Sequence, residues 1–288
     1  MNPGTGAAAM ARFFPLSFNA FNASPYFDTA VALPEQIDAA AGAGFELIGI
    51  DRGSIVSFEA EGGAADAIAE QLARAGLGCG AITAAGVIGA GPQTAAELAH
   101  AAAWADRLGA PFIQVNVALP PGQAAQAALD EACRTVAAIA PGVRLAIEYM
   151  PFSPLASVVE TVALARHVGF DRAGALIDVW HHERGPDSWD DLAAVPLEAI
   201  AYVEFDDALP LASDDLIGET LSRRTFPGEG EFDLTRFASV IRGTGYKGPV
   251  SVEVLSAEWR GGDLGAFARH CAETSRPYWR TAPPPPLR

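Results

Sequence analysis

Four strand-like segments of the sequence each lead into one acidic residue. The segments are 145–147, 175–177, 201–203 and 250–252, and the acids that follow them are Glu148, Asp178, Glu204 and Glu253. Short apolar runs of this kind are typical of parallel strands that are buried on both faces. The carboxyl ends of such strands meet at one face of an α/β barrel or one edge of an α/β sheet. The pattern therefore predicts that the four acids lie close together.

Strand-like and helix-like segments alternate from Phe13 to Thr274, which is typical of βα units on a parallel sheet. The predicted strands are 13–18, 46–50, 80–83, 111–115, 144–147, 175–177, 200–205 and 249–254. The predicted helices include 34–41, 64–75, 94–108, 124–139, 156–167 and 189–194. One more begins after Asp233, and the last follows strand 249–254 and ends near Thr274. Eight βα units in one chain of 288 residues predict an α/β fold of the (β/α)8 TIM barrel type.

We expect three parts along the chain. Residues 1–11 form a flexible leader, residues 12–276 a single barrel that is the catalytic domain, and residues 277–288 a proline-rich, extended tail. Within the barrel, the polar segment 206–231 shows no helical period. A loop of that length is typically a lid or a binding loop.

The composition limits the partners. With 35 acidic and 19 basic residues the net charge is −16, which disfavours nucleic acid and anionic membranes. No apolar run is long enough to span a bilayer. The cysteines Cys79, Cys133 and Cys271 have no metal-binding spacing and predict reduced thiols in a cytoplasmic protein. Alanine-rich helix surfaces would allow a homo-oligomer.

The four acids predict a divalent metal site. Like charges that meet in one pocket cannot all stay ionised unless a cation compensates them. Carboxylate oxygens favour Mn²⁺ or Mg²⁺, and Co²⁺ or Zn²⁺ remain open. At the third position, Asp206 and Asp207 follow Glu204 closely and could serve instead of it.

Several motifs carry a family resemblance that covers about residues 13–274. They are GFELIGI (44–50), IEY (147–149), IDVWH (177–181), PGEGEFDL (227–234) and GYKGPVSVE (245–253). With these motifs the chain resembles the xylose isomerase-like barrel superfamily, and within it the sugar-phosphate isomerase/epimerase group that includes ketose 3-epimerases and inosose dehydratases.

The resemblance implies a role for several residues. Glu148, Asp178 and Glu253 match metal ligands, and His181 and Arg224 match residues that bind substrate. Members of the family usually have His, and sometimes Gln, where this chain has Glu204. A fourth carboxylate would make the site harder and more anionic, which favours Mg²⁺ or Mn²⁺.

The function implied is that of a metal-dependent isomerase or epimerase of a sugar or polyol ketone. In the epimerases it resembles, the positions of Glu148 and Glu253 remove and return a carbon-bound proton beside a carbonyl, through a metal-stabilised enediolate. A dehydratase or lyase of a polyhydroxy ketone or cyclic keto acid, of the inosose or dehydroshikimate type, is an alternative. A non-catalytic barrel subunit is another. A DNA-repair endonuclease of the superfamily would need a histidine-rich zinc cluster and a basic groove, and this acidic chain has five histidines.

Other residues are predicted at the same mouth. Asn19 and Asn116 follow or end strands and are expected to contact substrate, while Trp180 is expected to wall the pocket. For Arg224, a solvated surface cation and a ligand-binding side chain are equally compatible with the sequence. The scarcity of basic residues near the mouth favours a neutral carbohydrate or polyol over a phosphate ester.

Overall fold

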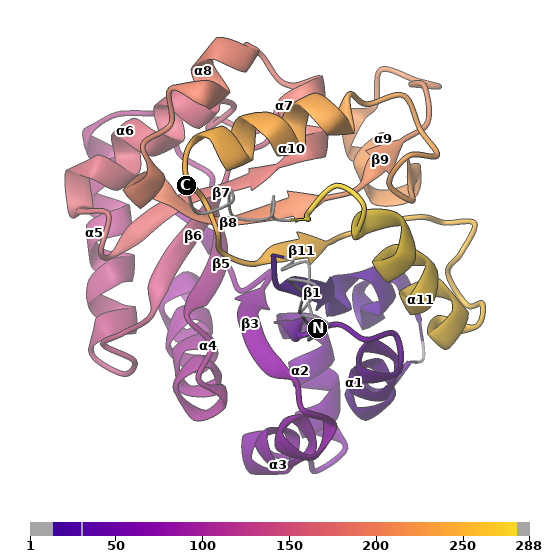
Figure 1. Ribbon diagram of the computed structural model, residues 1–288. Coiled ribbons are helices and arrows are strands. Elements are labelled where there is room, and N and C mark those ends of the chain that lie inside the picture. Colours follow the sequence, from indigo (N-terminus) through magenta and orange to yellow (C-terminus); the bar gives the residue numbers. More distant parts are fainter. Residues whose placement is uncertain (1–13, 30, 281–288) are drawn as a thin grey trace, which may run out of the picture.

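The computed structural model describes residues 14–29 and 31–280, and at its centre is a closed parallel barrel. Its eight strands, in chain order, are β1 (Leu16–Asn19), β2 (Leu47–Asp51), β3 (Gly78–Thr83), β5 (Phe112–Val117), β6 (Arg144–Glu148), β7 (Ala173–Asp178), β8 (Ile200–Phe205) and β11 (Val250–Val252). Each pairs in parallel with its neighbours (Figure 1). The barrel is closed because β1 pairs with β11 and Ile82 of β3 pairs with Ile113 of β5. The predicted (β/α)8 fold is confirmed.

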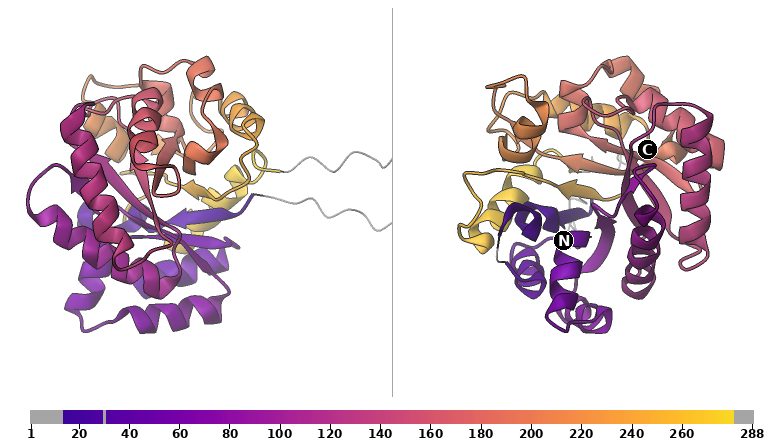
Figure 2. Two further views of the ribbon diagram at one scale, coloured as in Figure 1. Left: turned by 90° about the vertical axis from the view of Figure 1, so that its left-hand side faces the viewer. Right: turned by 180° about the vertical axis from the view of Figure 1, so that it is seen from behind.

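Helices surround the barrel on its outside (Figure 2). They are α1 (Leu33–Gly42), α3 (Ala65–Ala75), α4 (Gln93–Leu108), α5 (Gln123–Ala137), α6 (Val158–Val168), α8 (Trp189–Ala193), α10 (Leu234–Gly243) and α11 (Leu264–Ser275). Each buries one apolar stripe; in α3, for example, Ile68 and Leu72 lie one turn apart and are both buried. The main core lies between the helices and the strands, and a smaller apolar cluster that includes Leu176 and Tyr202 is separate from it.

Several helices and strands were not predicted from the sequence. They are α2 (Arg52–Ala60), β4 (Val87–Ile88), α7 (Val179–Arg184) and α9 (Leu216–Ser222), together with the strand pair β9 (Asp207–Ala208) and β10 (Arg224–Thr225). The prediction of an irregular loop over 206–231 is therefore wrong in part. Helix α9 has too few residues to show a helical period, and the capping side chain of Asp215 begins it.

The packed chain continues beyond residue 276, where we expected the tail to begin. Trp279 is fully buried against Phe14, Phe205 and Phe237, and its carbonyl accepts a hydrogen bond from the backbone N–H of Phe14 at 3.0 Å. The predicted leader 1–11 and the proline run of the tail lie outside the described residues.

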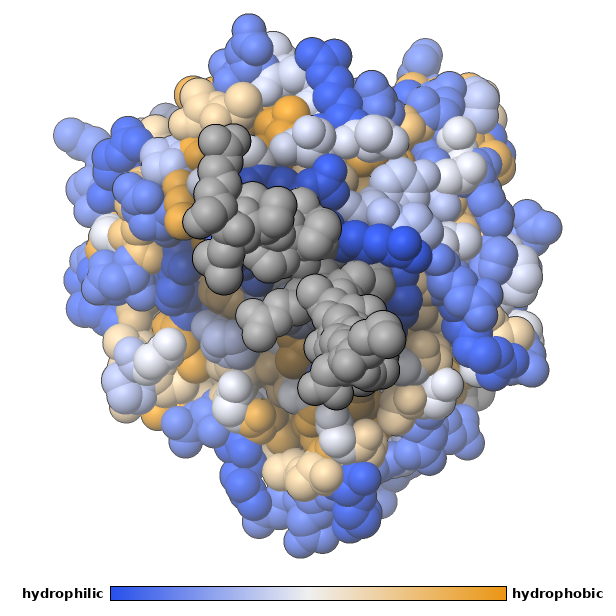
Figure 3. Space-filling model, in the orientation of Figure 1, coloured by the Kyte–Doolittle hydropathy of each residue, from blue (hydrophilic) through white to orange (hydrophobic). Residues whose placement is uncertain are grey.

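In the face shown in Figure 3, hydrophilic side chains form most of the outer edge of the molecule. Within residues 14–29 and 31–280, no helix combines the length and the apolar character that crossing a membrane requires.

Candidate metal centre and active site

The structure brings the four strand-end acids together. Glu148, Asp178 and Glu204 are the last or nearly last residues of β6, β7 and β8, and Glu253 directly follows β11. One carboxylate oxygen of each lies within 4.8 Å of the others, and all four side chains are buried. His181 belongs to the same place, because its Nε2 lies 3.5 Å from Asp178 Oδ2. A group of buried acids this dense is expensive unless a cation or protons compensate it.

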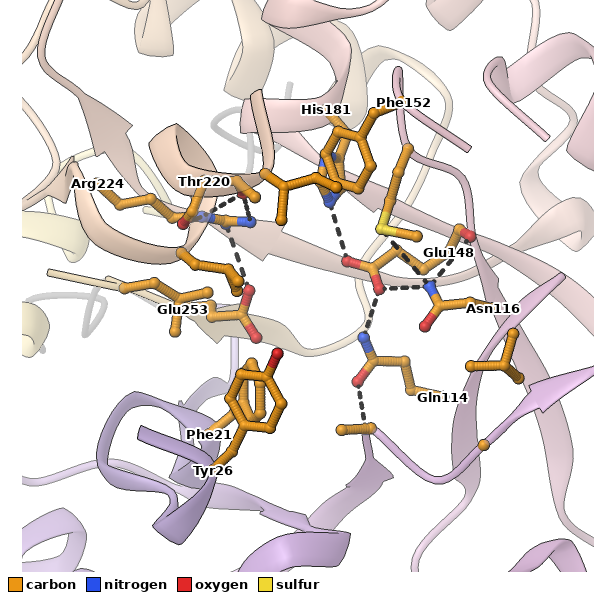
Figure 4. A pocket seen from close by; sticks show the side chains of 17 residues that line it. Phe21, Tyr26, Gln114, Asn116, Glu148, Phe152, His181, Thr220, Arg224 and Glu253 are labelled. Atoms are coloured by element: carbon orange, nitrogen blue, oxygen red, sulfur yellow. Dashed lines mark hydrogen bonds and ion pairs between the residues drawn. The ribbon is translucent and has the colours of Figure 1, made fainter. Parts of the chain in front are cut away.

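Three side chains, two amides and one imidazole, orient the carboxylate of Glu148. Gln114 Nε2 and Asn116 Nδ2 donate to its Oε2 at 2.7 and 2.9 Å. His181 Nε2 lies 3.1 Å from its Oε1 (Figure 4). Burial alone would raise the pKa of Glu148, but the bonds from His181 and Asn116 and the nearby charges of His181 and Arg224 hold that pKa below its ordinary value. Glu148 is thus kept ionised.

Glu253 and Glu204 are held from the other side by one amide. Asn19 Nδ2 donates to Glu253 Oε1 at 2.8 Å and to Glu204 Oε1 at 3.0 Å. Burial raises the pKa of Glu253 to about 8, against the opposing charge of Arg224 and with the repulsion of neighbouring acids. Burial and the charges of Glu253 and Glu148 raise the pKa of Glu204 well above its ordinary value. These two acids therefore tend to hold protons when no cation is bound.

Arg224 provides the positive charge within the cluster. Its Nη1 lies 2.9 Å from Asp178 Oδ2 and 3.4 Å from Glu253 Oε2, and it also pairs with Asp206. Its Nη2 donates to the Thr220 hydroxyl at 2.9 Å. The surface alternative for Arg224 is therefore excluded, since this side chain is buried among acids. Although burial opposes the charge, the acids raise the pKa of Arg224 well above its ordinary value.

A cavity of about 370 Å³ opens above the acids. Of the predicted site residues, Glu148, Glu253, His181, Arg224 and Asn116 line it. Asn19, Asp178 and Glu204 are buried and do not line the cavity; Asn19 donates to Glu204 instead. Most other lining residues are apolar: Phe21, Tyr26, Ala84, Val87, Met150, Phe152, Ile217, Leu221 and Leu255.

Trp180 does not lie on the cavity wall. Its side chain is buried, and its ring packs against the Arg224 guanidinium, with 5.7 Å from the guanidinium carbon to the ring centroid. Phe152, which we did not single out, lies on the wall instead, 6.0 Å from the His181 ring between centroids. The reason is that Trp180 and His181 are consecutive residues of α7, so their side chains point about 100° apart and His181 is the one that faces the cavity.

The two acids that could have replaced Glu204 have other partners. Asp206 pairs with Arg224. Asp207 accepts the backbone N–H groups of Gly228, Gly230 and Phe232, each at 3.0 Å, and so orders the predicted PGEG turn. Gln114, which donates to Glu148 and lines the cavity, is a further residue of this site that sequence reasoning missed. Its signal is the spacing of two from Asn116, which places both side chains on the same face of β5.

The residues present fit a divalent cation. Four buried carboxylates offer hard oxygen ligands from four separate strands, so their positions are fixed by the barrel. Glu204 Oε2 is buried in this cluster and has no hydrogen-bond partner among the described residues. An unpartnered, buried carboxylate oxygen is a polar atom that a metal ion would satisfy.

The family of this chain follows from its sequence. Residues 37–273 match the model of the family described as the xylose isomerase-like TIM barrel. The chain belongs to this family. The resemblance inferred from the sequence motifs is confirmed, and the strand-end acids occur within the matched part of the chain.

Two proteins are similar in sequence to part of this xylose isomerase-like barrel. The 3-dehydroshikimate dehydratase of Pseudomonas aeruginosa is 32% identical over 105 residues, which are 36% of this chain and 16% of that protein. The inosose isomerase of Halalkalibacterium halodurans is 27% identical over 120 residues, which are 41% of this chain and 42% of that protein. The matched segment thus spans less than half the length of either relative.

Solved structures share the whole barrel. The IolI protein, whose crystal structure contains a zinc atom, superimposes with a TM-score of 0.80 at 17% identity and covers 92% of this chain and 97% of its own. An L-ribulose 3-epimerase gives a TM-score of 0.67 at 20% identity, covering 92% and 93% of the two chains. At these identities the likeness concerns the fold.

Proposed function

We propose that this chain is a divalent-metal-dependent isomerase or epimerase that acts on a sugar or polyol ketone. The observation that carries the proposal is the placement of Glu148 and Glu253, which belong to the cluster of four buried carboxylates and line one cavity from two sides (Figure 4). Two carboxyl groups that face one cavity from two sides are suited to act as base and acid on a ligand between them. In the metal-free protein the pKa of Glu148 is held below its ordinary value and burial raises the pKa of Glu253 to about 8, which agrees with that division of roles.

The metal would be held by Glu148, Asp178, Glu204 and Glu253. When bound, a divalent cation supplies Lewis acidity that polarises a carbonyl and an adjacent hydroxyl of the substrate. Mn²⁺ and Mg²⁺ suit an all-carboxylate set best. Zn²⁺ and Co²⁺ stay open, and the zinc atom found in the IolI structure supports the general choice of a divalent ion.

In the proposed reaction Glu148 removes the proton from the carbon beside the carbonyl. His181, Gln114 and Asn116 prepare its carboxylate by holding both oxygens. Glu253 returns a proton to the carbon from the other side, after which Glu148 releases its proton to water and Glu253 takes one up, so that both groups are restored. His181 and Arg224 line the cavity as donors for substrate hydroxyl groups.

A second candidate is a dehydratase. It is favoured by the similarity to the 3-dehydroshikimate dehydratase of P. aeruginosa, at 32% identity. Such an enzyme would share the first proton abstraction and then expel hydroxide from the neighbouring carbon instead of accepting a proton. Product analysis separates the two, because only dehydration lowers the mass of the substrate by one water.

The test combines metal content with proton exchange. The protein is freed of metal by chelation and reloaded with Mn²⁺, Mg²⁺, Co²⁺ or Zn²⁺, and ketoses and inososes are then incubated with it in D₂O. We expect near-stoichiometric metal and deuterium at the carbon beside the carbonyl. Glu253→Gln should lose both, whereas Glu258→Gln, an exposed acid on the same segment, removes equal charge and should lose neither.

Two results would contradict the proposal. One is the absence of metal from both proteins, together with no stabilisation by any of the four cations. The barrel would then be better explained as a non-catalytic subunit. The other is full metal binding without deuterium uptake from any of the ketones tested, which would leave a metal centre with a different reaction.

A further inference from the structure

The cavity above the acids has a polar floor and an apolar outer rim. Its floor carries the carboxylates of Glu148 and Glu253, and its outer part is formed by loops that follow the strands. Figure 4 shows Phe21 and Tyr26 on one side of this opening and Phe152 on another. These aromatic groups come from segments after β1 and β6, and α9 adds Ile217. A polar reacting group would lie at the floor and the remainder of a ligand along an apolar rim.

Three of the rim side chains expose apolar surface. Tyr26 is 64% exposed, Ile217 is 51% exposed and Val87 is 39% exposed. They come from three different elements, a 3-10 helix after β1, strand β4 and helix α9, and line the same cavity. Exposed apolar groups that converge on a pocket are characteristic of ligand contact, because covering them removes apolar surface from water.

The charges of the cavity disfavour an anionic ligand. Among the described residues that line it, the cations are Arg224 and His181. Arg224 pairs with Asp178, Asp206 and Glu253, and His181 lies against Glu148. Neither side chain is left over to neutralise a carboxylate or a phosphate of the substrate.

A bound divalent ion would not reverse this balance. Together with Arg224 and a protonated His181 it would bring at most four positive charges to the centre. Five acids are buried there, namely Glu148, Asp178, Glu204, Asp206 and Glu253, and four of them remain charged when Glu253 carries the proton that it donates. Arg52, on the adjoining cavity, lies 3.3 Å from Glu97 and is also paired. The pocket therefore has no excess positive charge with which to attract an anion.

We infer that the substrate is an uncharged polyhydroxy ketone bearing an apolar substituent, which lies against Tyr26, Val87 and Ile217 at the rim. The inference rests on the proposed function for the position of the ketone at the floor. It narrows that function, because sugar phosphates and keto acids are excluded and a plain ketose would leave the rim uncovered.

Three ligands matched at one position test the inference. They are 6-O-methyl-D-fructose, 6-O-benzyl-D-fructose and D-fructose 6-phosphate, which differ only in the group on O6. Binding to the Mn²⁺-loaded protein is measured by calorimetry, with competition for weak ligands. We expect the benzyl ether to bind about tenfold more tightly than the methyl ether, and the phosphate about tenfold more weakly.

A pair of variants locates the effect at the rim. Ile217→Ser should reduce the advantage of the benzyl ether to less than about threefold, because it removes apolar contact area. Leu211→Ser is the control, since Leu211 is 44% exposed before the same helix α9 but does not line the cavity. Both side chains are largely exposed, so both variants should fold.

The outcomes separate the inference from the proposed function. Equal binding of the two ethers, tighter binding of the phosphate, or no binding of any of the three would overturn the inference. Deuterium exchange is followed in the same samples. Exchange without a benzyl preference would refute the inference and leave the proposed function standing. A benzyl preference that Ile217→Ser abolishes, without exchange, would support the rim contact and refute the reaction.

Discussion

The two halves of the barrel place different kinds of side chain at the carboxyl ends of their strands. Strands β6, β7 and β8 and the residue after β11 supply carboxylates, whereas β1 and β5 supply the amides of Asn19, Gln114 and Asn116. The amides donate to acids on strands beside their own: Asn19 to Glu253 after the neighbouring β11 and to Glu204 on the next strand, and the other two to Glu148 on the neighbouring β6. One half of the barrel thus provides the acidic charge, and amides from the other half fix where that charge lies.

Strand β2 is the exception in the first half, since it ends at an acid. Asp51 does not join the cluster of four. Its Oδ1 accepts from the Ser24 hydroxyl at 2.6 Å and from the Ser54 backbone N–H at 3.0 Å, and it caps α2. An acid at a strand end is thus structural in one half and part of the candidate metal centre in the other.

The largest effect should come from removing charge in the second half. Asp178→Asn keeps an oxygen that can cap α7 but loses a proposed ligand and the partner of Arg224. Loss of a residue that only hydrogen-bonds to a metal ligand lowers metal affinity by about 10–100-fold, so loss of a ligand itself should lower it by more than about 100-fold. Titration of the metal-free protein with Mn²⁺ measures this. Asp190→Asn, at an exposed acid, is the control, and equal affinities would argue against ligation by Asp178.

A smaller effect should follow a change in the first half. Asn19→Ala leaves all four carboxylates in place but removes the donor shared by Glu204 and Glu253. We expect metal affinity to fall by about 10–100-fold, as for other groups that orient ligands.

The control for Asn19 is Ser24→Ala. Ser24 caps the 3-10 helix Pro25–Phe27, just as Asn19 caps the one before it, but it bonds to Asp51 and to none of the four clustered acids. If both variants bind metal equally well, the amide half has no orienting role.

The acids could be predicted from the sequence because each lies at a strand end. A strand alternates its faces with a period of two, and a barrel brings all strand ends to one mouth. The partners of the acids follow from which strands are neighbours. Asn19 reaches Glu253 because β1 pairs with β11 and closes the barrel, a contact between residues far apart in the chain. Nothing local in the sequence around Asn19 indicates that pairing.

The position of Arg224 could not be predicted for a related reason. Whether it is solvated or buried depends on how 206–231 folds, and that segment is built from a short helix and two-residue strands. Elements of this length leave no periodic pattern. Asp207 organises the turn and Asp206 fixes the guanidinium, so two adjacent acids with the same chemistry have different roles.

The smallest expected effect concerns Glu204, whose Oε2 has no hydrogen-bond partner within residues 14–29 and 31–280. Its folded-state pKa lies well above the ordinary value of 4.5, because of burial and then of its acidic neighbours. The protonated form therefore stabilises the metal-free fold fully below the ordinary pKa, and this contribution is lost as the pH rises towards the folded-state pKa. Glu204→Gln cannot ionise and should keep it. Without metal, we expect its unfolding temperature to exceed that of the wild type by roughly 2–4 °C at pH 8 and by less at pH 5. Glu258→Gln should show no such pH-dependent gain. A Gln variant that is less stable at pH 8 would mean that Glu204 is ionised and paired in the metal-free protein.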